Sequence, residues 1–232
     1  MKKILFVFLL VFSINLYAED NIKPQEGAFN SLYVSATDID KYVSYLRSNS
    51  DAFKAIGSSD AGVCITRSGN QYPGQMMIWN AFPSVEAAMI GSLKYDPYKA
   101  KGPISKLRKV KHSTIWKSLK SFRLDPGHEV VGRFKVKQEN IPAFVQAIAS
   151  LEKEIQGNGH PDFFNGVFVS IAGGTESQTI KVRSITSSAS DQGKIADEYF
   201  NGKYKSFNDA VALTEGFVDE QIQICEQIYF TK

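Results

Sequence analysis

Residues 30–46 read NSLYVSATDIDKYVSYL, and residues 130–148 read VVGRFKVKQENIPAFVQAI. Each stretch begins with apolar residues at every second position, which is typical of a strand. Each then passes through a polar turn into apolar residues at helical spacing. The helical positions correspond at one constant offset: Ile39 with Ile141, Tyr42 with Phe144, Val43 with Val145, and Leu46 with Ile148. We therefore expect the chain to contain two copies of one structural unit.

The segments that follow repeat in the same order. Residues 61–69 (AGVCITRSG) are similar to residues 165–173 (NGVFVSIAG), with Gly62 over Gly166 and Gly69 over Gly173. The pattern then predicts a third strand at 75–82 and 178–185, a second helix at 85–93 and 191–200, and a last strand at 113–122 and 221–230. Each half thus reads β-α-β-β-α-β, the order of a ferredoxin-like unit, and the predicted fold class is α+β.

A ferredoxin-like sheet carries its helices on one face, so its other face needs a cover. A second copy of the unit would supply that cover. At this point the chain resembles the dimeric α/β-barrel superfamily of the antibiotic-biosynthesis-monooxygenase type, with both protomers fused in one polypeptide. The resemblance rests on element order over about residues 30–230. It implies two tandem ferredoxin-like repeats, at 30–125 and 128–232, which form a pseudo-dimeric α/β barrel.

The first eighteen residues predict an export signal. Lys2 and Lys3 precede an apolar run at 4–12, and Ala18 offers signal peptidase a small residue before an acidic pair. A membrane anchor is the alternative, but a spanning helix needs roughly 20 apolar residues, and polar residues interrupt this run at positions 13 and 15. We expect cleavage near Ala18, a short N-terminal segment at 19–29, and a periplasmic or secreted protein that does not span the membrane.

The only two cysteines are Cys64 and Cys225. An exported chain meets an oxidising compartment, where an even pair of cysteines is a disulfide candidate. Strand parity directs both side chains away from the more apolar, helix-covered face of the sheet. In the superfamily that the chain resembles, the second strand of one half lies beside the last strand of the other. The resemblance therefore implies a disulfide between Cys64 and Cys225, and two unpaired core cysteines are the alternative.

The three histidines, His112, His128 and His160, are not spaced as a metal-binding pair, so no metal site is predicted. His160 and Asp162 form a candidate loop site. A solvent-exposed loop histidine is the interpretation we favour for His160.

Haem-degrading members of the superfamily use an Asn, a Trp and a His around the haem. This chain has Trp79, Asn80 and Trp116, with His112 nearby in sequence. Their positions do not reproduce the family pattern, so none of them is assigned a catalytic role. We expect Trp79, Asn80 and Trp116 to line a cavity, with plain core packing of the tryptophans as the alternative.

Residues 94–123 form the strongest charge anomaly, with ten Lys or Arg and one acid. The candidate anion-binding residues within this run are Lys101, Lys106, Arg108, Lys109 and Lys111. A solvated surface that balances the acidic remainder of the chain explains the run as well. Interleaved aromatic residues are also typical of nucleic-acid binders. An exported protein meets little nucleic acid, however, so an anionic surface or ligand is the better hypothesis.

Two functions therefore stay open. The first is a non-catalytic exported protein that needs no cofactor and binds a small apolar or anionic ligand, or a partner. The second is a cofactor-poor or haem-linked monooxygenase or isomerase that acts in a cavity between the helices and the sheet. The sequence contains no recognisable catalytic constellation, which favours the first.

Overall fold

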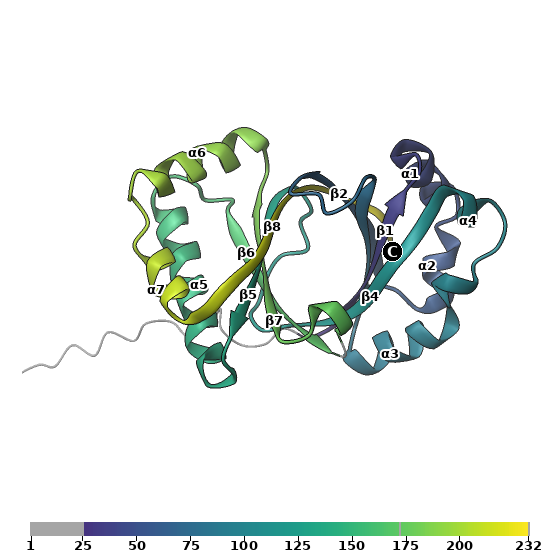
Figure 1. Ribbon diagram of the computed structural model, residues 1–232, viewed down its shortest axis with the longest axis horizontal. Helices are drawn as coiled ribbons and strands as arrows, with labels where there is room; N and C mark the ends of the chain where they lie inside the picture. The colour runs from purple at the N-terminus through teal and green to yellow at the C-terminus, as the bar shows by residue number, and fades with distance from the viewer. Residues whose placement is uncertain (1–25, 172, 232) are drawn as a thin grey trace, which may run out of the picture.

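The computed structural model describes residues 26–171 and 173–231, and the eight strands of this part of the chain close into one barrel (Figure 1). The strands are β1 Ala28–Ala36, β2 Asp60–Ser68, β3 Gln75–Phe82, β4 Arg108–Ser118, β5 His128–Val136, β6 Phe164–Ile171, β7 Thr179–Thr186 and β8 Thr214–Phe230. The order around the barrel is β1-β3-β2-β8-β5-β7-β6-β4. All eight pairings are antiparallel.

The barrel divides into two runs of four strands. The first four strands are neighbours in the order β4-β1-β3-β2, and the last four in the order β8-β5-β7-β6. Two seams join these runs, one where β2 pairs with β8 and one where β4 pairs with β6. Closure leaves no strand edge open, which removes the usual site of edge-to-edge aggregation.

Helices cover two opposite outer sides of the barrel (Figure 1). On one side lie α1 Ile39–Ser48, α2 Asp51–Ile56, α3 Val85–Lys94 and α4 Pro103–Leu107, and on the other lie α5 Ile141–Gly157, α6 Ala189–Phe200 and α7 Ser206–Ala212. Three longer helices start at side-chain caps, because Asp38, Ser84 and Ser188 each accept a hydrogen bond from a backbone N–H of the first turn. Short 3-10 turns complete the structure at η1 Pro97–Lys99, η2 Gln138–Asn140 and η3 Gly174–Glu176.

Strand alternation builds separate cores on the two faces of the sheet. On the outer face, Leu32 and Val34 pack under the first group of helices, and Val167 packs under the second group. On the inner face, Tyr33 and Trp79 pack inside the barrel with the two cysteines. Neighbouring residues of one strand thus belong to different environments.

The predicted α+β class is confirmed, and the predicted strands and helices occur in the predicted order. Three further helices, α2, α4 and α7, were not predicted, and two strand boundaries are wrong. The run predicted at 113–122 is β4 Arg108–Ser118, and the last strand begins at Thr214 rather than at 221. The additional residues of β4 pair with β1 and those of β8 pair with β5, so pairing within each half extends both strands beyond their own apolar pattern. The predicted signal peptide, 1–18, lies outside the described residues, and no helix in the described part is long and apolar enough to cross a membrane.

Candidate functional site

Two cavities lie on opposite faces of the barrel wall. The sheet–helix pocket lies between the first run of strands and helices α1 to α4, and its volume is about 360 Å³. The barrel cavity lies on the inner face, and its volume is about 220 Å³. Small-molecule sites commonly measure about 300–1,000 Å³, so the sheet–helix pocket is large enough for an organic ligand and the barrel cavity suits a smaller molecule.

The sheet–helix pocket is predominantly apolar. The apolar part of its wall consists of Leu32, Leu46, Phe53, Ile56, Ile78 and Ile104. These side chains come from two strands and three helices, so the packing of the first group of helices on the sheet shapes the pocket. A few polar groups interrupt this wall, as is usual in sites that orient a ligand.

Asn80 is the most unusual of these polar groups. It lies on β3, lines the pocket and is only 7% exposed. Its Oδ1 atom has no hydrogen-bond partner among the described residues. Buried polar atoms in proteins are nearly always bonded, and leaving one unbonded costs about 1–3 kcal/mol. Asn80 thus places an unsatisfied, buried acceptor beside the pocket.

Arg108 brings a positive charge to the same pocket. This first residue of β4 is buried, and its guanidinium donates to Tyr42 Oη at 2.5 Å and to Tyr95 Oη at 2.5 Å. Burial raises the pKa of Tyr42 to about 12 although Arg108 acts in the opposite direction, so the Tyr42 phenol oxygen serves as a neutral acceptor at pH 7. Among the described residues, Arg108 has no carboxylate partner. The exposed Lys101 adds a second cation at the pocket wall.

The barrel cavity contains a buried lysine that forms no ion pair with a described carboxylate. Lys181 on β7 is 5% exposed, and its Nζ atom donates to Tyr33 Oη and lies 3.7 Å from the centre of the Trp116 ring. No described carboxylate lies within ion-pair distance of it. Burial lowers the pKa of Lys181 to about 7, although Glu176 opposes this shift. Burial likewise holds the pKa of Tyr33 well above its usual value.

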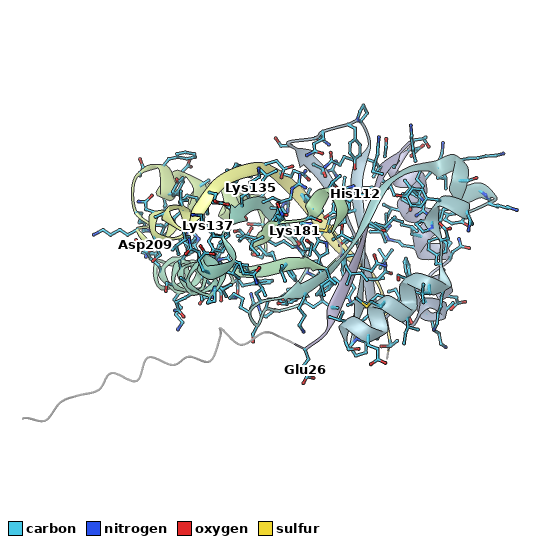
Figure 2. All side chains as sticks on the ribbon, turned by 60° about the horizontal axis from the view of Figure 1, so that its bottom comes forward. Glu26, His112, Lys135, Lys137, Lys181 and Asp209 are labelled. Atoms are coloured by element: carbon cyan, nitrogen blue, oxygen red, sulfur yellow. A yellow bond between two sulfur atoms is a disulfide. The ribbon has the colours of Figure 1, made fainter. Side chains whose placement is uncertain are left out.

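The acids near the cavity are already engaged by other cations. Glu176 Oε2 accepts from Arg133 Nη1 at 2.7 Å, and Glu176 Oε1 lies 3.3 Å from His112 Nε2. Arg133 Nε also donates to Asp219 Oδ1 at 2.6 Å. Burial alone would raise the pKa of Glu176, but its His112 hydrogen bond and the nearby cations lower it to about 2. His112 and Lys181 both lie in the central part of the molecule, between the two groups of helices (Figure 2).

The deeper wall of the barrel carries the disulfide. Cys64 on β2 and Cys225 on β8 are paired across the seam and joined by an S–S bond of 2.03 Å. Next to them, the fully buried Glu129 accepts from Arg183 Nε at 2.7 Å. Both cysteines face the barrel interior, on the side that strand parity predicted.

The structure separates the three predicted cavity residues. Trp79 and Trp116 face the barrel interior, where they line a space of about 20 Å³, and Asn80 faces the sheet–helix pocket. Trp79 and Asn80 are consecutive residues of one strand, so they cannot share a face.

The five candidate anion-binding residues do not form one cluster either. Arg108 and Lys101 line the sheet–helix pocket, whereas Lys111 lies over the Tyr72 ring at 4.3 Å, at the rim of the barrel cavity. Lys106 and Lys109 are exposed and line neither cavity. Alternation along β4 and the short α4 helix account for this dispersal.

The interpretation of His160 as a solvent-exposed loop residue is wrong. His160 is 6% exposed, and its two ring nitrogens lie 2.6 Å from Asp191 Oδ1 and 2.9 Å from Glu198 Oε2. Both acids belong to α6, which folds over the loop. His160 therefore anchors α6 through a polar cluster, and Asp162 is not its partner.

Sequence reasoning missed the charged groups of the barrel cavity. Lys181 and Arg183 occupy alternate positions of the predicted strand at 178–185, so parity could have assigned them to the inner face together. Their partners could not be found in this way, since Tyr33, Glu176 and Glu129 come from three distant segments.

No protein-family model and no curated protein matches the sequence. Solved structures with a similar fold exist, however. A candidate monooxygenase from Fusobacterium nucleatum has 13% identity and a TM-score of 0.52, covering 87% of this chain and 94% of its own. A haem-binding protein from Thermus thermophilus has 11% identity and a TM-score of 0.51, covering 88% and 94%. A mutant chlorite dismutase from Candidatus Nitrospira defluvii has 9% identity and a TM-score of 0.54, covering 87% and 91%. The chain thus shares the α+β barrel fold of monooxygenase-like and chlorite dismutase-type proteins.

Proposed function

We propose that this protein binds a hydroxylated or N–H-bearing apolar small molecule in the sheet–helix pocket. The observation that carries the proposal is the unpartnered, buried Oδ1 atom of Asn80 in a predominantly apolar wall. A structural asparagine would satisfy this oxygen within the protein, as nearly all buried polar atoms do. A ligand donor at this position would recover the lost hydrogen bond on binding.

The charges at the pocket add a preference for an anionic or electron-rich end. Arg108 is fixed by two phenol oxygens, so its guanidinium is held in place before a ligand arrives. Preorganised groups bind better because less conformational entropy is lost on association. We therefore propose an aromatic or polycyclic ligand with a hydroxyl or N–H for Asn80 and an acidic group for Arg108 or Lys101. The similar fold of a candidate monooxygenase supports substrate turnover at this site as the second candidate function.

The similar folds raise the question of whether this protein binds haem. The two cavities do not fit a haem group. Haem iron is held by His, Cys, Met or Tyr. Of these types the sheet–helix pocket offers only Tyr45 and Tyr95, and Tyr95 Oη already accepts from Arg108. His112 does line the barrel cavity, but that space is small and bordered by the Arg133–Glu176 ion pair. A large apolar macrocycle would have to break this pair. We expect no saturable Soret band when haem is added, and a saturable band would revive the haem-linked function.

We also infer that the chain consists of two ferredoxin-like units, at 30–125 and 128–232, fused into a pseudo-dimeric barrel. The equivalent neighbour orders β4-β1-β3-β2 and β8-β5-β7-β6 support this inference. Fragment 30–125 alone would leave the outer edges of β2 and β4 unpaired, so we expect it to self-associate in sedimentation experiments. A stable monomeric fragment would contradict the inference.

Export with cleavage near Ala18 remains part of the proposal. The disulfide is consistent with an oxidising compartment. N-terminal sequencing of the protein from the producing cell is expected to start near Glu19, and retention of Met1 would contradict it.

The binding proposal is tested with the anionic aromatic probe 8-anilinonaphthalene-1-sulfonate, which carries both an N–H and an acidic group. Ala52 of α2 lines the pocket and is exposed, so Ala52→Trp should fill the pocket without disturbing the core. Ala55→Trp, on the same helix but outside the pocket, is the matched control. We expect the first variant to weaken probe binding at least about tenfold, equivalent to roughly 1.4 kcal/mol, and the control to bind normally. Equal binding by both variants would refute the site.

A further inference from the structure

The barrel cavity holds a second candidate for chemistry, centred on Lys181. Its side chain is buried inside the barrel, yet every carboxylate near the cavity already has other cationic partners: Glu176 and Asp219 pair with Arg133, and Glu129 pairs with Arg183. Among the described residues, the Lys181 Nζ atom donates to the Tyr33 hydroxyl and lies over the rings of Tyr33 and Trp116. A lysine retained merely to neutralise a buried acid would be paired with that acid.

The energetics of this environment favour the neutral amine. Removing an ammonium from water has an effective penalty of several kcal/mol in real proteins. The cation–π contact with Trp116 offsets part of this penalty. The charges that act on Lys181 also oppose one another, because Glu176 and Asp219 favour the ammonium while Arg133 and Arg183 disfavour it. A neutral lysine amine has a free lone pair and is a nucleophile.

The cavity gives this amine access to a small reactant. Lys181 lines the space of about 220 Å³, and exposed residues at its rim, among them Gln71 and Val218, connect it to solvent. Since a water molecule occupies about 30 Å³, the space admits a molecule of a few heavy atoms. Tyr33 and Tyr72 line the same space, and burial raises the pKa of both phenols, so both stay protonated and can donate to a carbonyl oxygen.

We propose that Lys181 forms a Schiff base with a small aldehyde or ketone in the barrel cavity. The Nζ lone pair attacks the carbonyl carbon, and the carbonyl oxygen takes up a proton to give a carbinolamine. Loss of the nitrogen proton and of the hydroxyl as water then leaves the C=N bond. Tyr33, whose Oη contacts Nζ, is placed to pass a proton between nitrogen and oxygen. No redox partner is needed, and the reaction is independent of the ligand proposed for the sheet–helix pocket.

Reductive trapping of the full chain tests this proposal. The protein is treated at pH 7 with a limiting amount of propanal and sodium cyanoborohydride, and the alkylated lysines are mapped by peptide mass spectrometry. Ordinary lysines have a pKa of about 10.4, so their neutral fraction at pH 7 is about a thousandfold lower than that of Lys181. The lower intrinsic nucleophilicity of a less basic amine offsets part of this gain. We expect Lys181 to be labelled at least about tenfold faster than any surface lysine.

Two variants and a pH series sharpen the result. Lys181→Met should abolish the fast labelling, and Lys137→Met, which removes an exposed lysine outside the cavity (Figure 2), should retain it. The titratable and charged groups that face Lys181 in the cavity are Tyr33, Tyr72, His112, Glu176, Arg133, Arg183 and Asp219. Burial lowers the pKa of Lys181 itself to about 7. The labelling rate should therefore rise with pH and level off above about 7. An unlabelled Lys181 in folded wild-type protein, or labelling spread evenly over surface lysines, would overturn the proposal even if Lys181→Met fails to fold.

Discussion

At the scale of single residues, the two cavities differ in how their polar groups are balanced. The Oδ1 atom of Asn80 is a hydrogen-bond acceptor without a partner in a predominantly apolar wall. Lys181 is a base whose pKa is lowered by burial, which favours its neutral form. Both arrangements reduce the stability of the folded chain. Groups that reduce stability in this way are concentrated at functional sites, which is why these two residues carry the functional proposals.

Replacing Asn80 should make the protein more stable while weakening the site. Asn80→Leu removes a buried oxygen without a partner and keeps a similar volume, so we expect the free energy of unfolding in urea to rise by about 1 kcal/mol. Gln75→Leu is the matched control on the same strand, because Gln75 Oε1 accepts from Gln71 N at 2.7 Å and its Nε2 donates to Gln221 Oε1 at 3.0 Å, so its loss should lower stability. A destabilised Asn80→Leu would show that the amide has a structural role.

The stability of the chain should depend on pH through Lys181. Its pKa is lowered from 10.5 to about 7 in the folded state, so between these values the unfolded chain binds more protons than the folded one. Stability from this group therefore rises with pH above about 7, by up to about 1.4 kcal/mol per pH unit. Urea unfolding at pH 7 and pH 9 should show this rise in wild-type protein and a smaller one in Lys181→Met. The same slope in both proteins would mean that Lys181 is charged in the fold.

At the scale of elements, glycines make room for large inner-face aromatic residues. A Cβ on Gly62 of β2 would lie 2.3 Å from the Trp79 ring and 2.2 Å from the Glu226 carbonyl oxygen. A Cβ on Gly166 of β6 would lie 2.6 Å from the Phe168 ring. The two glycines that correspond between the halves thus serve the same packing purpose.

Gly62→Ala should therefore destabilise the protein. Overpacking of this kind costs about 1–3 kcal/mol, and the rigid ring and backbone carbonyl leave little freedom to relax. Gly193→Ala in α6 is the control, since its new methyl group meets nothing within 4 Å and should add roughly 0.5–1 kcal/mol. Thermal unfolding of both variants checks the contrast, and an unchanged melting temperature for Gly62→Ala would contradict the packing account.

Element order could be read from the sequence because it depends on local periodicity. The boundaries of β4 and β8 could not, because residues 108–112 and 214–220 pair with β1 and β5 although they lack the apolar alternation that marks a strand. The same holds for the sites. Asn80 was found as a residue type but assigned to the same cavity as Trp79, and the Lys181 cluster was missed because its members come from both halves.

At the scale of the whole molecule, the two runs of strands depend on each other. Each exposes two edges that only the other covers, and the disulfide ties one seam across 161 residues. Loss of a native disulfide commonly costs about 2–5 kcal/mol. We expect Cys64→Ala/Cys225→Ala to lower the urea midpoint accordingly and to be insensitive to reductant. Two alkylatable thiols in the unreduced wild-type protein would contradict the bond.

The two cavities also differ in which strands build them. The sheet–helix pocket belongs to the first run of strands and its helices, whereas the barrel cavity needs strands of both runs. Mutations at the seams should therefore disturb Lys181 more than Asn80.

A crystal structure of the protein with 8-anilinonaphthalene-1-sulfonate tests the central claim most directly, since it locates the ligand. We predict probe density between the first run of strands and helices α1 to α4, with its N–H within hydrogen-bond distance of Asn80 Oδ1. Density only in the barrel cavity or on the outer surface, with the sheet–helix pocket empty, would contradict the account.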